Sequence, residues 1–370
     1  MKIGINATCF NDRPSGAKQR FLGIYYQVMK QMQDSTFVIY QPSDYDLSHF
    51  FKDLTNVTFK KTPIPSNGRI KKFLKGKLYW KSALLTENFD LFECLNLPIV
   101  KAPTGKTLLT IHDIRDMSSN TKNMKSLLYK FVISHSLKSA DHIITVSKSM
   151  KEEILKCFPN LGISVIYNGI NLLDFQEKSK EDLQGLRQRI NLPQNFFLSV
   201  GHLEKRKNYL NLIDALLYLR KNNDVYHLVI IGNDNNYKKI INNYIDTKNL
   251  KEYVKIYSGL SDEDVRTLYQ HCDLFIFPSY YEGFGIPILE AMASKTEILL
   301  SNLPVFREIT QNKLNYFDPN DFVSIANSIK NSLDSKKKKK NLMAYGEERI
   351  KEFEFEKLSK KMKKLYQSIS

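Results

Sequence analysis

The amino-acid sequence predicts an α/β protein built from two parallel β-sheets, each covered by helices on both faces. Three observations support this prediction. Short apolar runs alternate with longer amphipathic segments, this alternation occurs twice along the chain, and the 370 residues exceed the usual size of one domain. We therefore expect two domains, at residues 1–170 and 171–351, with the break near residues 168–189, where the sequence turns polar.

Ten apolar runs are the candidate strands. Those of the first half lie at residues 2–7, 37–40, 107–113, 142–147 and 164–169, and those of the second half at residues 196–201, 227–232, 254–259, 273–279 and 297–301. Amphipathic segments between them predict helices, among them residues 16–32, 208–223 and 262–272. Because ligands of open parallel sheets bind at the carboxyl ends of the strands, we expect functional residues in the loops that follow these runs.

The composition is that of a globular protein that does not cross a membrane. Hydrophobic residues make up 42% of the chain and charged residues 25%, and every apolar run falls far short of the ~18 residues of a membrane span. The N-terminus turns polar too early for a signal peptide, which predicts a cytoplasmic protein. The four cysteines have no paired spacing, so we expect neither a zinc cluster nor a disulfide framework.

The net charge of +16 is concentrated in the first half, where residues 1–170 hold 24 Lys and Arg against 13 Asp and Glu. Residues 69–85 combine apolar positions at helical spacing with a run of basic residues, which predicts a basic amphipathic helix. Such a helix can lie on anionic lipid headgroups, or it can be an ordinary surface helix of a lysine-rich protein. The residues that would contact a membrane or an anionic acceptor are Arg69, Lys71, Lys72, Lys75 and Lys77.

Two other basic features have plainer interpretations. A nucleic-acid partner is disfavoured, because the remaining basic residues are scattered and the sequence has no helix-turn-helix or RNP-like motif. The lysine run at residues 336–340 is expected to be a solvated turn between two helices.

The first strand of the second half leads into a basic loop. The strand ends at Gly201, the loop carries Lys205, Arg206 and Lys207, and a helix begins near Asn208. Cations so close to a helix N-terminus oppose the helix dipole, unless an anion binds there. Arg206 and Lys207 are therefore candidate partners of a bound anion, although solvated loop cations remain the structural alternative.

A second strand, loop and helix follow in "DLFIFPSYYEGFGIPILEAMA", where Pro287 suits the first helical turn. Gly283 and Gly285 let the main chain approach a ligand and expose its N–H groups. Glu282 would project from the loop, and Glu290 would lie about one turn into the helix. Carboxylates accept hydrogen bonds from sugar hydroxyls, so two of them opposite a basic loop favour a nucleotide sugar as the ligand.

Together, "EGFGIPILEAMA", "GHLEKRKN" and "VIYNGINLLDF" resemble the retaining glycosyltransferases of family 4, which have the GT-B fold of two Rossmann-like domains facing each other across a cleft. The resemblance implies that Glu282 lies by the transferred sugar and Glu290 grips the ribose. It also implies that Arg206 and Lys207 neutralise the diphosphate and assist its departure. The other donor-binding positions that it implies are Gly201, the backbone near Leu260, Gly283 and the main-chain amides of Phe284, Gly285 and Ile286.

The resemblance extends to the first half and to the end of the chain. In "RPSGAKQRF", Gly16 and Ala17 stand where the family has a phosphate-approaching loop, and His112 of "LLTIHDIRDM" matches a histidine that touches the donor sugar or the departing phosphate. A C-terminal helix at about residues 352–370 would pack back on the first domain, as in the family. His202 departs from the family pattern, in which Arg or Thr is common.

Two Asp-x-Asp strings raise the question of a metal ion. Asp262 and Asp264 are better explained as a helix start with Ser261 as the N-cap. Asp44 and Asp46 follow an early strand, and the pattern leaves a metal role open for them. We nevertheless expect no metal and no cofactor, because Arg206 and Lys207 can neutralise a diphosphate without a divalent cation.

The resemblance implies a metal-independent, retaining hexosyltransferase that uses a nucleotide sugar. The "LEKRKN" loop is similar to that of mannosyl- and rhamnosyl-transferring members of the family, which favours GDP-mannose as the donor. The acceptor would be a glycan or a lipid-linked molecule in bacterial surface polysaccharide synthesis, such as lipopolysaccharide, at the inner face of the membrane. The alternatives are a UDP- or dTDP-sugar donor, or a catalytically idle homologue that only binds a nucleotide sugar.

Overall fold

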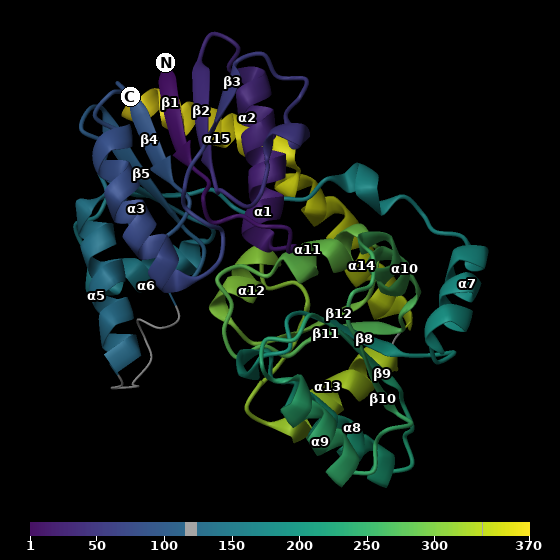
Figure 1. Cartoon of the computed structure of the whole chain (residues 1–370). Helices are drawn as coiled ribbons and strands as arrows, with labels where there is room; N and C mark the ends of the chain where they lie inside the picture. Colours follow the sequence, from purple (N-terminus) through teal and green to yellow (C-terminus); the bar gives the residue numbers. More distant parts are fainter. Residues whose placement is uncertain (115–123, 335) are drawn as a thin grey trace. The chain divides into compact units, whose positions relative to one another are not determined.

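The computed structural model describes residues 1–114, 124–334 and 336–370, and the chain divides into two units (Figure 1). Unit 1 comprises residues 1–170 and 354–370, so both ends of the chain belong to it, and unit 2 comprises residues 171–353. Each unit has a parallel sheet with helical connections, as the alternating pattern of the sequence predicts.

The sheet of unit 1 has seven parallel strands in the order β3-β2-β1-β4-β5-β6-β7. Their bounds are β1 (Lys2–Asn6), β2 (Thr36–Gln41), β3 (Val57–Lys61), β4 (Leu91–Cys94), β5 (Lys106–Ile111), β6 (His142–Thr145) and β7 (Ile163–Val165). Two of these strands were not predicted from the sequence. β3 is a half-exposed edge strand with little apolar character, and the apolar run of β4 is interrupted by the buried carboxylate of Glu93.

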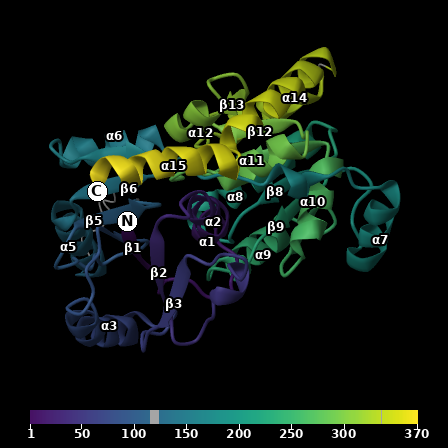
Figure 2. The ribbon, with the colours of Figure 1, turned by 90° about the horizontal axis from the view of Figure 1, so that it is seen from above.

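Helices cover both faces of this sheet because neighbouring side chains on a strand point to opposite sides. Ile39 joins a core with residues from the first helical segment and from α15, whereas the next residue, Tyr40, packs edge-on against Trp80 of α3. α15 also packs against η1 and α2 (Figure 2). The elements are α1 (Gly16–Arg20), the π-helical turn η1 (Phe21–Tyr25), α2 (Tyr26–Gln31), η2 (Ser48–Phe50), α3 (Arg69–Ala83), α5 (Met124–Ser139), α6 (Lys148–Cys157) and α15 (Phe355–Ile369).

α3 confirms the helix expected from residue 69 onward, but two of its apolar side chains do not face the core as amphipathic spacing would suggest. Gly76 and Trp80 are buried, while Leu74 and Leu78 are 57% and 77% exposed. The reason is that Tyr79 and Trp80 form the aromatic contact with Tyr40 and thereby choose the face that docks.

The sheet of unit 2 has six parallel strands in the order β10-β9-β8-β11-β12-β13. Their bounds are β8 (Phe197–Val200), β9 (Leu228–Ile231), β10 (Val254–Tyr257), β11 (Leu274–Phe277), β12 (Ile298–Ser301) and β13 (Asn315–Phe317). The sequence predicts all of these except β13, a strand of three residues at the sheet edge that is too short to show a period.

The helices of unit 2 again lie on both faces of the sheet. α8 packs against α13 over one face, and α11 packs against α14. Their bounds are α7 (Lys180–Ile190), α8 (Tyr209–Lys221), α9 (Lys238–Thr247), α10 (Asp262–His271), α11 (Ile286–Ala293), α12 (Pro304–Ile309), α13 (Phe322–Leu333) and α14 (Lys336–Ile350), with the short turns η3 (Leu172–Phe175), η4 (Lys205–Lys207) and η5 (Lys351–Phe353).

The prediction of a turn at residues 336–340 is wrong, because these lysines begin α14. Lys339 explains part of this outcome. Its Nζ lies 3.3 Å from Oε2 of the buried Glu297 and donates to the Asp273 carbonyl, so at least one lysine of the run ties the helix to the core.

Candidate functional site

The topological switch point of unit 2 lies between β8 and β11. These strands are neighbours in the sheet although 73 residues, 201–273, lie between the end of β8 and the start of β11. The chain leaves β8 towards one edge of the sheet and leaves β11 towards the other. The loops after these strands therefore meet at their carboxyl ends, where the Tyr280 N–H donates to the Arg206 carbonyl over 2.8 Å. Crevices at such points are where open parallel sheets bind ligands.

An ion cluster joins the two loops. Glu282 Oε2 lies 2.7 Å from Arg206 Nη1, and Glu282 Oε1 lies 2.7 Å from Lys207 Nζ. Arg206 also pairs with Glu204 over 2.7 Å, and Ser279 donates its hydroxyl to Glu282 over 2.8 Å. The structure thus brings together Arg206, Lys207 and Glu282, which the sequence nominated from two separate motifs.

Burial makes this cluster electrostatically strong. The Lys207 and Glu282 side chains are only 7% and 9% exposed. Burial alone would raise the pKa of Glu282, but the charges of Lys207 and Arg206 outweigh it and hold that pKa below its ordinary value. Burial lowers the pKa of Lys207, and the Glu282 charge opposes this effect. Two cations thus meet two carboxylates in a largely desolvated place.

Two glycines make room for this arrangement. A Cβ on Gly201 would lie 3.0 Å from Lys207 Cε. The absence of a side chain at Gly201 therefore leaves room for the aliphatic part of the Lys207 side chain. Gly285 has a φ of +117°, and a Cβ there would lie 3.0 Å from the Phe306 ring. Both positions therefore favour glycine for steric reasons, independently of any ligand.

α11 begins where the sequence predicts, with Gly285 as the N-cap and Pro287 in the first turn. Gly283, Phe284 and Gly285 are buried directly before it, and Ile286 is the first helical residue. The amides that the resemblance nominates thus lie at the N-terminus of this helix, whose dipole favours negative charge.

Glu290 lies one turn further along α11 and accepts a hydrogen bond from the Tyr269 hydroxyl over 3.0 Å. Burial raises its pKa to about 7, and the Tyr269 hydrogen bond only partly offsets that effect. At neutral pH this carboxyl is therefore divided between its charged and neutral forms, unlike Glu282.

Leu260 lies half-buried in the loop between β10 and α10, a third strand end at the same edge of the sheet.

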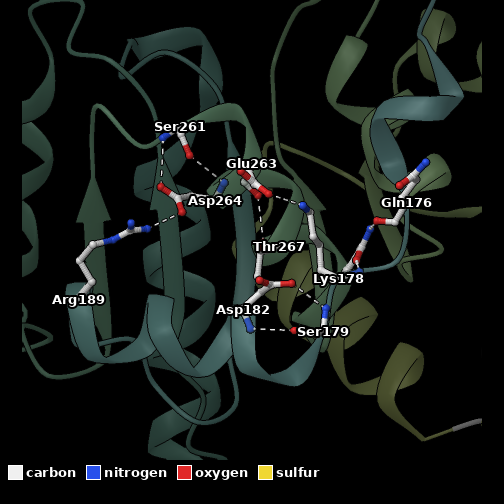
Figure 3. Close-up of polar contacts among 10 residues, drawn as sticks. Gln176, Lys178, Ser179, Asp182, Arg189, Ser261, Glu263, Asp264 and Thr267 are labelled. Atoms are coloured by element: carbon white, nitrogen blue, oxygen red, sulfur yellow. Dashed lines mark hydrogen bonds and ion pairs between the residues drawn. The ribbon is translucent and has the colours of Figure 1, made fainter.

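The start of α10 confirms that Asp264 has a structural role at a helix N-terminus. Ser261 and Asp264 form a reciprocal N-terminal capping box, and Asp264 also pairs with Arg189 (Figure 3). In the same figure Lys178 pairs with Glu263, which ties the segment entering unit 2 to α10.

The other Asp-x-Asp string is used by turns of unit 1. Asp44 accepts from the Ser66 N–H over 2.7 Å, and Asp46 accepts from the N–H and hydroxyl of Ser48. Within residues 1–114, 124–334 and 336–370, no three His, Cys, Asp or Glu side chains come together in a way that could hold a metal ion.

The remaining donor-side candidates belong to unit 1. Gly16 and Ala17 are the first two residues of α1, which Ser15 caps through its side chain. His112 directly follows β5, which ends two residues before the end of the candidate strand at residues 107–113. Burial lowers the pKa of His112 to about 3, with a further lowering from the Arg20 charge, so this imidazole is neutral at physiological pH.

The basic residues of α3 differ in their surroundings. Lys71, Lys75 and Lys77 are exposed, whereas Lys72 is half-buried and donates to the Ser66 carbonyl over 3.2 Å. The side chain of Arg69 lies outside the described residues. In the described part of the chain, no helix combines the length and apolar character needed to span a bilayer.

Sequence reasoning missed three residues of the unit 2 site: Glu204, Ser279 and Tyr269. Glu204 and Ser279 lie within the motifs that the sequence singled out, so their positions in the two loops could have nominated them. Tyr269 is on α10, and no local signal links it to Glu290, because that contact depends on how α10 and α11 pack.

Comparison with known families matches both halves of the chain. Residues 31–173 match the model described as "Glycosyltransferase Family 4", and residues 184–349 match the model described as "Glycosyl transferases group 1". Among solved structures, Anabaena Alr3699/HepE in complex with UDP and glucose has a TM-score of 0.77 at 18% identity, with each chain covered completely. This similarity confirms the predicted GT-B fold class of two Rossmann-like α/β halves.

Two curated relatives are each 31% identical to this chain. The O-antigen chain mannosyltransferase RfbU of Salmonella typhimurium matches over 237 residues, which cover 64% of this chain and 62% of that protein. A second match, over 254 residues, is the N-acetylgalactosamine-N,N'-diacetylbacillosaminyl-diphospho-undecaprenol 4-alpha-N-acetylgalactosaminyltransferase of Campylobacter jejuni, covering 64% and 65%. Each match therefore spans less than two thirds of the relative's own length.

Proposed function

The chain belongs to the family 4 glycosyltransferases, and from this premise we propose that it transfers a hexose from a nucleotide sugar to a glycan or lipid-linked acceptor. The observation that carries the proposal is the cluster of Arg206, Lys207 and Glu282 at the switch point of unit 2. A diphosphate needs cations, a sugar needs hydrogen-bond acceptors, and this cluster supplies both within one desolvated place.

In the proposed reaction, Arg206 and Lys207 hold the diphosphate of the donor. Both keep Glu282 as a partner while they do so, because a guanidinium has five N–H donors and an ammonium has three. Glu282 remains ionised and accepts hydrogen bonds from the hydroxyls of the transferred sugar. The N-terminus of α11 adds main-chain N–H groups to the phosphate side.

We propose that transfer proceeds with retention and without a metal ion. The acceptor oxygen bonds to the anomeric carbon from the face that the diphosphate leaves, and the proton of the acceptor hydroxyl passes to a departing phosphate oxygen. Arg206 and Lys207 stabilise the negative charge that grows on the leaving group. His112, neutral by virtue of its burial, would contribute as a hydrogen-bonding group and not as a cation.

Glu290 is proposed to hold the ribose. Its pKa of about 7 means that it accepts two ribose hydroxyl hydrogen bonds best above neutral pH. Gly16 and Ala17, at the start of α1, are proposed to meet the phosphates. Gly201 and Leu260 complete the proposed donor-binding set, at the carboxyl ends of β8 and β10.

GDP-mannose is our favoured donor, and the similarity to an O-antigen chain mannosyltransferase supports this choice. The Campylobacter relative is named for N-acetylgalactosamine transfer to a diphospho-undecaprenol acceptor, which supports a lipid-linked acceptor in surface polysaccharide synthesis. A UDP- or dTDP-sugar is the alternative donor. The proposed location is the cytoplasm, with peripheral contact through the basic helix α3 at the inner face of an anionic membrane. A homologue that binds the donor without transferring it is the second candidate.

A donor panel tests these proposals. The purified chain is incubated with GDP-, UDP- and dTDP-sugars in the presence of EDTA, and binding and slow donor hydrolysis are measured. We expect one nucleotide sugar to bind and to be hydrolysed without metal. Binding without any hydrolysis or transfer would support the idle homologue, and no binding to any donor would contradict the proposed function.

A matched pair of variants tests the site itself. Lys207→Met keeps the buried stem and removes the charge, so we expect donor hydrolysis to fall about 10²- to 10³-fold. Lys205→Met changes an exposed cation in the same turn and should leave hydrolysis near the wild-type rate. Equal rates for the two variants would contradict the assignment of Lys207.

A further inference from the structure

α5 of unit 1 has apolar side chains on two opposite faces. Ile133 and Leu137 are buried against the unit, and the Ser136 hydroxyl accepts from the Ile99 N–H over 3.1 Å. The opposite face carries four large apolar side chains, which we call the α5 stripe: Met124, Leu127, Leu128 and Phe131, exposed by 81%, 52%, 64% and 69%. A surface helix ordinarily has polar residues on its outer face.

The α5 stripe forms one continuous surface. Its members lie at positions i, i+3, i+4 and i+7, the spacing of neighbours along one side of a helix. Scattered exposed apolar residues need no explanation, but four on adjacent turns of one helix mark a surface that is covered in use.

Exposed lysines on α5 and α3 favour a lipid surface as the occupant of the stripe. Neither α5 nor α3 contains an Asp or Glu. Lys138 is exposed on α5, and the exposed lysines of α3 alternate with two exposed leucines: Lys71, Leu74, Lys75, Lys77, Leu78 and Lys81. Both helices lie at the same end of unit 1 in the two views (Figures 1 and 2). Exposed apolar side chains among lysines complement a lipid surface with anionic headgroups.

We propose that the α5 stripe inserts into the interface of an anionic lipid bilayer while the lysines of α3 contact the headgroups. This inference deepens the membrane contact proposed above and rests on that part of the proposed function alone. It assigns the apolar part of binding to α5, a helix that the sequence pattern did not single out. The two helices contribute different interactions. The lysines of α3 attract the chain to anionic lipid over a distance, whereas the apolar area that α5 buries holds the chain at the membrane surface.

The test is co-sedimentation of the full chain with vesicles of phosphatidylcholine alone and of phosphatidylcholine mixed equally with phosphatidylglycerol. We expect binding to the anionic vesicles only. The stripe variant replaces all four members by Gln: Met124→Gln, Leu127→Gln, Leu128→Gln and Phe131→Gln. Its partitioning should fall at least about tenfold, because apolar area withdrawn from water is the term it removes.

The matched control also replaces exposed apolar residues, but in unit 2. Leu173→Gln, Val225→Gln and Ile240→Gln change side chains that are 76%, 54% and 48% exposed, and we expect this variant to bind as the wild type does. A third variant, Lys71→Gln with Lys75→Gln and Lys77→Gln, should weaken binding by about fivefold for each lysine and make it less sensitive to salt. If the stripe variant does not fold, the single change Phe131→Gln replaces it.

Three outcomes would overturn the proposal. The stripe variant could bind anionic vesicles as the wild type does, the wild type could bind neither kind of vesicle, or sedimentation velocity could show a dimer that the stripe variant abolishes. The last result would make a second copy of the chain the occupant. Donor hydrolysis without vesicles is measured on the same samples, so failure of the proposed reaction is recognised separately from failure of membrane docking.

Discussion

Two buried carboxylates, one in each unit, have pKa values that are shifted in opposite directions. Glu282 of unit 2 is held by two cations, which keep its pKa below the ordinary value. Glu93 of unit 1 accepts hydrogen bonds from three hydroxyls, those of Tyr25, Thr110 and Tyr366, and burial raises its pKa. The cations at Glu282 thus outweigh the effect of burial on the pKa, whereas the hydroxyls at Glu93 offset it only in part.

The difference corresponds to different places in the fold. Glu282 lies in a loop after a strand, where we propose that a ligand meets it, and its charge belongs to the proposed chemistry. Glu93 lies within β4 and is completely buried, and its Tyr366 partner comes from α15, 273 residues away along the chain. The Glu93 network therefore fastens the last helix to the sheet of unit 1.

The largest expected effect comes from removing the carboxylate that is paired with cations. Glu282→Ala leaves the Lys207 ammonium buried without its nearest counter-ion, so we expect the free energy of unfolding to fall by about 3 to 5 kcal/mol. Urea denaturation followed by circular dichroism measures this change. Glu263→Ala breaks the exposed pair with Lys178 in the same unit and should cost less than about 1 kcal/mol. Similar losses for both variants would contradict the comparison.

Glu290 tests whether burial raises the pKa of a carboxyl that accepts a hydrogen bond from a hydroxyl, as it does at Glu93. Its pKa is about 7 in the folded protein against an ordinary value of 4.5. The folded state therefore holds the extra proton between these values, and stability should fall as pH rises through this window, by on the order of 3 kcal/mol. Glu290→Gln should remove this component of the pH dependence. An unchanged stability profile in the variant would show that Glu290 does not titrate in this way.

Tyr366 tests the hydroxyl network of unit 1. Tyr366→Phe removes one donor from Glu93 and keeps the ring, so we expect a loss of about 1 to 2 kcal/mol in unfolding free energy. Tyr26→Phe removes a hydroxyl that binds Asp53 at the surface of the same unit, and it should cost less than about 0.5 kcal/mol. Amide hydrogen exchange in α15 should increase for the first variant only. Unchanged exchange there would mean that the network does not fasten the helix.

The smallest expected effect on stability at neutral pH concerns His112, whose pKa is about 3. We expect its imidazole resonances to show no titration between pH 5 and pH 8 in the folded chain. The same side chain in the unfolded chain titrates with a pKa of about 6.5. Because folding lowers the pKa of His112, protonation of this histidine opposes folding. Its contribution to stability is therefore complete above the unfolded pKa of about 6.5 and is lost as the pH falls towards about 3. A folded-state titration above about pH 5 would contradict its buried, neutral state.

Much of the fold could be predicted because the signals are local. The strands β8 to β12 and the start of α11 next to Pro287 follow from apolar runs and turn residues within short windows. The prediction failed where tertiary packing decided the outcome. Glu93 interrupts the apolar run of β4 because three hydroxyls satisfy it, and residues 336–340 form a helix in which Lys339 reaches the buried Glu297.

The candidate site was predictable in its members but not in its contacts. Sequence motifs nominated Arg206, Lys207 and Glu282 one by one. Their direct pairing requires β8 and β11 to be neighbours, which is a property of the strand order. The exposed face of α5 likewise cannot be predicted from the sequence, since only packing shows which of its two apolar faces the unit covers.

The sequence by itself determined the α/β alternation, the division into two halves and the strand, loop and helix motifs, because periodicity and turn chemistry act over a few residues. Only the tertiary structure decided which charges meet and which apolar surfaces stay open. The charge of Glu282, the raised pKa of Glu290 and the uncovered α5 stripe all depend on groups brought together from distant parts of the chain, and burial sets how strongly those groups interact.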